Sequence, residues 1–207
     1  MLITNDLISS LNPCKDRHDN YKNAYLGVEL TLDDFLDSDK ISYTDKIWVS
    51  CKLLTATQAR TFAILCAESV LHIFEAKYPN NKAPRELLDY LKTIDWLAVT
   101  EMQQIEIKRL RYAAAAAAHA ATYAADAAAA HAATAAADTA AAAASYDADA
   151  AASYAADAAA SYAAHAADAA SYDAADTAAA YAADAARKNQ EDLNLTYLKM
   201  AFSLGAT

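Results

Sequence analysis

Apolar residues recur every three or four positions through residues 1–112, which is the spacing of one face of an α-helix. The segment after Thr55 carries the broadest stripe, made of Phe62, Leu65, Cys66, Val70, Ile73 and Phe74. Shorter stripes follow Thr44 and Pro84, and they are made of Ile47, Trp48, Cys51 and Leu54, and of Leu87, Leu88, Leu91 and Trp96. The pattern predicts several amphipathic helices that share a core.

Residues that favour helix ends divide this part of the chain. Three pairs have the spacing of an N-terminal cap: Thr31 with Asp34, Thr55 with Gln58, and Thr100 with Gln103. Pro79 disfavours the α conformation at Tyr78, so we expect the helix that follows Thr55 to end there. Pro84 suits the first turn of the next helix.

The pattern changes at Ala113. From Ala113 to Ala186, 48 of the 74 residues are alanine, and the others are only His, Thr, Tyr, Asp or Ser. These polar residues recur at threes and fours in one near-continuous stripe, with a period slightly above 3.6. Such a period argues against a left-handed heptad coiled coil. Since alanine has the highest helix propensity, pattern and local preference both predict helix.

Two arrangements of this tract remain open. One unbroken helix would span about 110 Å, whereas a folded-back tract would pack two or three helices through their alanine faces. We favour the folded-back bundle, because a bare helix of that length is rarely stable without a partner. The sequence therefore predicts an all-α protein with an N-terminal helical domain, an alanine-rich helical region, and a C-terminal helix and tail: residues 1–110, 111–188 and 189–207.

Charge is distributed as unevenly as alanine. Residues 113–186 hold nine Asp and no Lys or Arg, while the rest of the chain holds 18 acids and 17 bases, so nearly all of the formal charge of −10 lies in the tract. Such a charge repels nucleic acid and favours a basic partner. A simpler interpretation is that the aspartates only keep an alanine helix in solution.

Composition also bears on location. The alanine tract never runs 18 residues without Asp or His, so we expect no membrane span. Cys14, Cys51 and Cys66 are dispersed and form no C-x-x-C motif, which fits a reducing compartment. We expect a cytoplasmic protein.

Catalytic and metal-binding patterns are weak. His165 and Asp168 lie one helical turn apart and could hold a general base, but a polar stripe on an exposed helix is the better explanation. There is no H-x-x-x-H pattern and no glycine-rich loop that could cradle a phosphate. We therefore expect no catalytic residue, no metal and no cofactor, and a protein that is not an enzyme.

Tyrosine and aspartate form a cadence in the tract. Tyr146, Tyr154 and Tyr162 are spaced by eight residues, and tyrosine is a favoured interface residue. These tyrosines could instead fill gaps between alanine helices. The predicted partner-binding residues are Tyr146, Asp149, Tyr154, Asp157, Tyr162, His165, Asp168, Tyr172 and Asp176.

The stretch FAILCAESVLHIFEAKYPNNKAPRELLDYLK, residues 62–92, resembles the alanine-rich immunity proteins of bacterial and phage genomes. The residues that carry the resemblance are Cys66, Ala67, Glu68, Leu71, Phe74, Glu75, Tyr78, Pro79, Pro84 and Arg85. At Asn81 and Lys82 the chain departs from the acidic residue and arginine that this family often has. The spacing of Glu68 and Glu75 also has a structural interpretation, because both would lie on one helix face and could pair with Arg85 or Lys77.

The resemblance implies neutralisation of a toxin or effector by binding. We therefore expect an inhibitor, immunity-like or acting in phage counter-defence, that associates stoichiometrically with a protein partner such as a basic toxin or defence effector. Nucleic acid and membrane are not expected as partners. The alternative is a structural module that forms homo-oligomers through its alanine helix faces.

Overall fold

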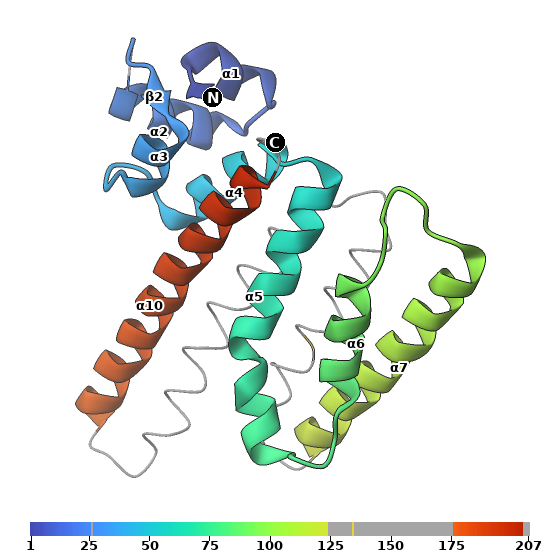
Figure 1. Ribbon diagram of the computed structural model, residues 1–207. Helices are drawn as coiled ribbons and strands as arrows, with labels where there is room; N and C mark the ends of the chain where they lie inside the picture. The colour runs from blue at the N-terminus through green and yellow to red at the C-terminus, as the bar shows by residue number, and fades with distance from the viewer. Residues whose placement is uncertain (26, 124–133, 135–175, 205–207) are drawn as a thin grey trace. The chain divides into compact units, whose positions relative to one another are not determined.

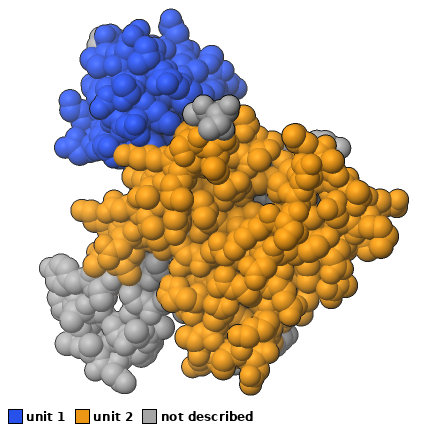
Figure 2. Space-filling view, in the orientation of Figure 1, with its two compact units in different colours: residues 1–54 blue, residues 55–207 orange. Residues whose placement is uncertain are grey.

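The computed structural model is mostly helical and confirms the predicted all-α fold (Figure 1). It describes residues 1–25, 27–123, 134 and 176–204. Within these residues lie eight helices and one sheet of two short strands. The chain divides into two compact units, Met1–Leu54 and Thr55–Thr207 (Figure 2).

The first unit contains two strands and four helices, namely β1 (Leu2–Ile3), α1 (Asn5–Ser10), α2 (Lys15–Tyr25), β2 (Leu30–Thr31), α3 (Leu32–Asp37) and α4 (Tyr43–Leu53). The strands pair antiparallel, with Leu2 opposite Thr31 and Ile3 opposite Leu30. The unit has a small core, and its largest fully buried side chains are Ile3, Ile8, Phe35, Leu36 and Ile47.

Side-chain caps determine where two of these helices begin. The Asp34 amide donates to Thr31 Oγ1 over 3.1 Å, which confirms the predicted start of α3. The start of α4 differs from the prediction, because the Asp45 amide donates to Ser42 Oγ over 3.1 Å and the helix begins at Tyr43, before Thr44. Serine is at least as strong an N-cap as threonine, and Ser42, two residues before Thr44, accepts a hydrogen bond from the Asp45 amide.

The second unit contains four helices, namely α5 (Ala56–Lys77), α6 (Ala83–Lys92), α7 (Glu101–Tyr123) and α10 (Asp176–Ser203). Helix α6 packs against both α5 and α7, and α10 packs against α5. Packed neighbours run in opposite directions in Figure 1, so α7 and α10 are antiparallel to one another.

Both predicted capping boxes are present, at Thr55 with Gln58 and at Thr100 with Gln103. In each box the glutamine Oε1 accepts a hydrogen bond from the threonine backbone N–H, over 2.9 and 2.8 Å. The threonine Oγ1 accepts in return from the glutamine backbone N–H, over 3.3 and 3.2 Å. Helix α5 ends at Lys77, two residues before Pro79, and Pro84 lies in the first turn of α6, as predicted.

The core of the second unit crosses the change in composition at Ala113. Its largest fully buried side chains include Phe74, Leu87, Leu88, Leu91 and Ile107. The same cluster continues along α7 into Leu110, Ala114, Ala117 and Ala118. Trp96, predicted to lie in the core, is only half-buried, and the Arg60 guanidinium stacks on its ring with the two centres 4.8 Å apart.

The two units do not coincide with the predicted ranges 1–110, 111–188 and 189–207. The first predicted range contains the boundary between Leu54 and Thr55, while α7 and α10 run through the predicted boundaries near residues 110 and 188. Composition suggested those boundaries, but the buried face of α7 passes from leucine to alanine without interruption. Alanine therefore extends the core here instead of marking its end.

The two ends of the alanine-rich tract lie in α7 and α10, which run antiparallel within the same unit (Figure 1). Residues 124–133 and 135–175 lie outside the described residues, so the folded-back arrangement stays a prediction.

Candidate protein-binding face

Helix α7 has apolar residues on two opposite sides. Ile107 and Leu110 face the core and are 2% and 4% exposed, whereas Met102, Ile105 and Tyr112 are 74%, 54% and 74% exposed. At 100° per residue, the three exposed side chains fall within an arc of about 80° on the side away from Ile107. A globular helix needs only one apolar stripe to cover a core, so the second requires another explanation.

Arg109 lies within this exposed arc and pairs with Glu106 at its edge. Arg109 donates from Nε to Glu106 Oε2 over 2.8 Å and from Nη2 to Glu106 Oε1 over 2.6 Å. This hydrogen-bonded pair lowers the pKa of the Glu106 carboxyl and keeps both groups ionised. We define the outward face of α7 as Met102, Ile105, Arg109 and Tyr112. Because its only charge is already paired, covering this face leaves no uncompensated ion.

Single exposed apolar residues are ordinary on protein surfaces, but several on one stripe characterise docking sites. Tyrosine, methionine and arginine are also the residue types that interfaces enrich. The outward face of α7 combines these residue types with this clustering. It is therefore the surface of the described residues that best fits contact with another protein.

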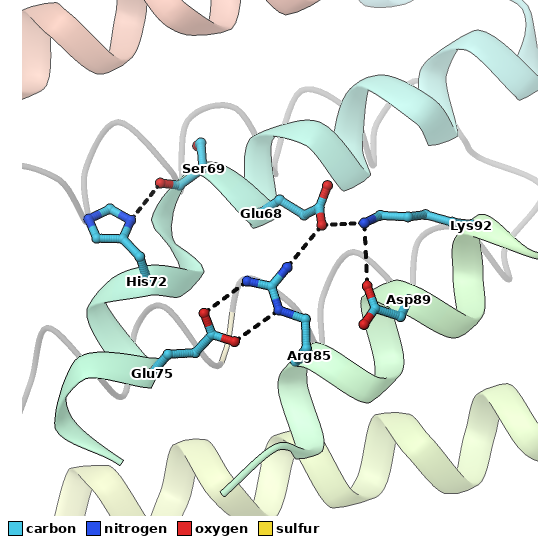
Figure 3. A network of polar contacts seen from close by, with 7 residues as sticks. All are labelled: Glu68, Ser69, His72, Glu75, Arg85, Asp89 and Lys92. Atoms are coloured by element: carbon cyan, nitrogen blue, oxygen red, sulfur yellow. Dashed lines mark hydrogen bonds and ion pairs between the residues drawn. The ribbon is translucent and has the colours of Figure 1, made fainter. Parts of the chain in front are cut away.

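A network of charged side chains holds α6, on which α7 packs, against α5 (Figure 3). Arg85 donates from Nε and Nη2 to the two carboxylate oxygens of Glu75, each over 2.9 Å, and from Nη1 to Glu68 Oε1 over 3.1 Å. Lys92 contacts Glu68 as well, and its Nζ lies 3.4 Å from Asp89 Oδ1. The predicted pairing of Glu68 and Glu75 with Arg85 is confirmed, whereas Lys92 and Asp89 were not anticipated. Lys92 follows Arg85 by seven residues, so helical spacing alone could have placed it on the same face.

The pair of Glu75 and Arg85 has a predictable dependence on pH. The hydrogen bonds from Arg85 lower the pKa of the Glu75 carboxyl below its usual value of 4.5, against the opposing effect of burial. A group with a lowered folded-state pKa stabilises the fold above its unfolded pKa, and that contribution disappears as the pH falls through the folded-state pKa.

We therefore expect Arg85→Gln to lower the free energy of unfolding near neutral pH by about 1 kcal/mol, since the pair is bidentate but partly exposed. The difference from the native chain should shrink below about pH 4. Denaturant titration at several pH values measures it. In a double-mutant cycle with Glu75→Gln, the combined loss should be smaller than the sum of the single losses, and strict additivity would contradict the coupling.

Helix α10 is positioned on α5 by polar side chains far apart in the sequence. Gln58 Nε2 donates to the Phe202 carbonyl over 3.3 Å near one end of the pair. Further along, Gln190 Nε2 donates to Ser69 Oγ over 2.7 Å and to Asn194 Oδ1 over 3.0 Å. Asn194 is 0% exposed. Buried polar contacts of this kind restrict two helices to one register, because any shift would leave the polar groups without partners.

Most of the predicted partner-binding residues lie outside the described part of the chain, namely Tyr146, Asp149, Tyr154, Asp157, Tyr162, His165, Asp168 and Tyr172. Asp176 is the first residue of α10. The outward face of α7 was not predicted from the sequence. The signal was present in the segment from Met102 to Tyr112, where apolar residues occur on two opposite sides of the expected helix.

Among the described residues, no three His, Cys, Asp or Glu side chains are grouped so that they could hold a metal ion. In the same residues, no helix combines the length and apolar character that a bilayer crossing requires. The first unit has a cavity of about 10 Å³ beside Arg17 and Trp48, which is far smaller than the pockets that hold organic ligands. It also has a larger, open hollow of about 500 Å³, lined by residues that include Asn20, Lys40 and Asp45.

The fold and this face define an all-α protein with an exposed apolar stripe along α7. No family model matches the chain, and no curated protein or solved structure matches it either.

Proposed function

We propose that this protein acts by stoichiometric association with another protein. The observation that carries the proposal is the outward face of α7, where Met102, Ile105 and Tyr112 are each more than half exposed on one side of a helix whose other side is buried in the core. Removing these side chains from water on binding would contribute roughly 1.5–3 kcal/mol for each, before the cost of association.

The activity that we propose for this association is inhibition of a toxin or defence effector, immunity-like or in phage counter-defence. This choice follows the resemblance seen in residues 62–92, which no family model matches. The charge of the alanine-rich tract adds the chemistry of a partner, because nine aspartates without any Lys or Arg favour a basic protein. The packed helices α5, α6 and α7 would serve as the scaffold.

Affinity capture from the native host with matched variants tests this proposal. Ile105→Gln with Tyr112→Gln should reduce the amount of captured partner at least tenfold, because buried tyrosine and aliphatic anchors dominate interface energies. Tyr154→Ala with Asp157→Ala tests the tract in the same way. The control is Met200→Gln on α10, which alters an exposed methionine elsewhere in the same unit. Equal capture by the native chain and by both double variants would refute the proposal.

A structural oligomerisation module is the alternative function. It is favoured by the continuation of the outward side of α7 into alanine, where Ala116 and Ala120 are exposed. Alanine faces allow helices to approach closely and gain dispersion contacts. A large homo-oligomer in light scattering, together with no specific captured protein, would favour this alternative.

A further inference from the structure

The open hollow of the first unit lies beside α2 and the start of α4, and we call it the α2–α4 hollow. Its volume of about 500 Å³ falls in the range of pockets that hold organic ligands, about 300–1,000 Å³. Five of its seven lining side chains are polar or charged, so the hollow suits a ligand that forms hydrogen bonds. The lining consists of Asn20, Asn23, Ala24, Lys40, Ile41, Ser42 and Asp45.

Two asparagine amides line the hollow from one helix. Asn20 and Asn23 lie three residues apart on α2, about 4.5 Å along the helix axis. Within the part of the chain that the structure describes, no hydrogen bond commits either side-chain amide. Each amide offers both a donor and an acceptor, so each can bond to the C=O or the N–H of a peptide group.

Charge in the lining is carried by Lys40 and Asp45. The Asp45 carboxylate is balanced by Arg17, whose Nε lies 3.3 Å from Asp45 Oδ1. Lys40 Nζ lies 5.5 Å from the centre of the Tyr25 ring. This cation–π contact holds the ammonium in place without using its N–H donors. The hollow therefore has one positive charge in excess, which favours an anionic group.

A carboxylate that follows a peptide group fits both features of the hollow. The Lys40 ammonium would pair with the carboxylate through a charge-assisted hydrogen bond. Residues of an extended peptide are about 3.3 Å apart, so amides about 4.5 Å apart on α2 can reach neighbouring peptide groups. An inorganic anion would leave both amides unused, and a cation would be repelled by Lys40.

We propose that the α2–α4 hollow binds a carboxylate preceded by a peptide group, as found at the C-terminus of a protein or in a free acylated amino acid. Lys40 pairs with the carboxylate, and Asn20 and Asn23 bond to the peptide groups before it. Capture of a terminal carboxylate is an established mode of peptide recognition. The inference goes beyond the proposed function, because the site lies in the first unit and uses no residue of the outward face of α7.

Titration of the whole ¹⁵N-labelled chain with N-acetyl-trialanine tests the site. The side-chain amide signals of Asn20 and Asn23 in the NMR spectrum should shift to saturation, with a dissociation constant roughly between 0.1 and 1 mM. The same peptide with a C-terminal amide should bind about tenfold more weakly, because it lacks the charge that Lys40 recognises. Absence of a saturable shift, or equal affinity for the two peptides, would overturn the inference.

Matched variants separate the roles of the lining residues. Lys40→Gln should abolish the preference for the acid over the amide peptide, whereas Lys22→Gln, an exposed lysine of α2 outside the lining, should keep it. Asn23→Ala should weaken both peptides alike, by about fivefold. All three positions are exposed, so the circular dichroism spectrum should stay unchanged. A Lys40→Gln variant that still prefers the acid would contradict the assignment.

N-acetylalanine distinguishes the two sources of the carboxylate, because it carries the same terminal group without further residues. Tighter binding of N-acetyl-trialanine than of N-acetylalanine would support the C-terminus of a protein as the ligand. Equal affinities, both lost to the same extent in Lys40→Gln, would support a small free acid.

Discussion

Leu88→Ala is expected to lower the free energy of unfolding of the second unit by about 2–5 kcal/mol. Leu88 is 0% exposed and lies on α6, within the core that α5 and α7 share. Truncation removes buried apolar surface and leaves a cavity that close-packed neighbours fill only in part. Alanine is a better helix former than leucine, so a loss of stability cannot come from the helix propensity of α6.

Leu97→Ala is the matched control, because Leu97 is 92% exposed in the connection before α7. The same chemical change there should alter stability by no more than about 0.5 kcal/mol. Trp48 belongs to the first unit and Trp96 to the second, so a Trp48→Phe background lets tryptophan fluorescence report the second unit alone during denaturant unfolding. Equal losses for Leu88→Ala and Leu97→Ala would contradict the packing of α6.

Asn194→Asp is expected to destabilise the contact between α10 and α5 by about 3 kcal/mol or more at neutral pH. Asn194 is 0% exposed and accepts a hydrogen bond from Gln190. The substitution keeps the shape of the side chain and an acceptor oxygen but adds a negative charge. Removing that charge from water is costly.

The loss caused by Asn194→Asp should depend on pH with a defined sign. Burial raises the pKa of the introduced carboxyl in the folded state above its unfolded value of about 3.9. The destabilisation is therefore complete above the folded-state pKa and diminishes as the pH falls toward the unfolded value. Unfolding of the variant and the native chain, followed by circular dichroism at several pH values, measures this difference.

Asn194→Leu provides the comparison. It removes the acceptor without adding charge, and Gln190 retains its hydrogen bond to Ser69. We expect a smaller loss of about 1–2 kcal/mol that does not vary with pH. A pH-independent loss for Asn194→Asp would show that the carboxyl is hydrated, and that the polar contacts between α5 and α10 are not enclosed.

Local features of the sequence predicted much of the second unit. The capping boxes at Thr55 and Thr100 and the proline at position 79 placed helix ends where the structure has them, because caps and prolines act on backbone groups within a few residues. Helical spacing also placed Glu68 and Glu75 within reach of Arg85. These contacts join α5 to α6, which follows it directly in the chain, and the spacing of Glu68 and Glu75 on one helix face is set by the helix geometry.

The tertiary structure decided the features that depend on distant parts of the chain. Both sides of α7 carry large apolar residues, and only the packing of α6 selects Ile107 for the core and leaves Met102 exposed. The contact of α10 with α5 joins residues 121 and 144 positions apart. No local preference specifies such pairings, because they depend on which faces lose most contact with water when the whole unit closes. Sequence alone therefore determined the helices and their ends, whereas packing determined which of their faces remain available for binding.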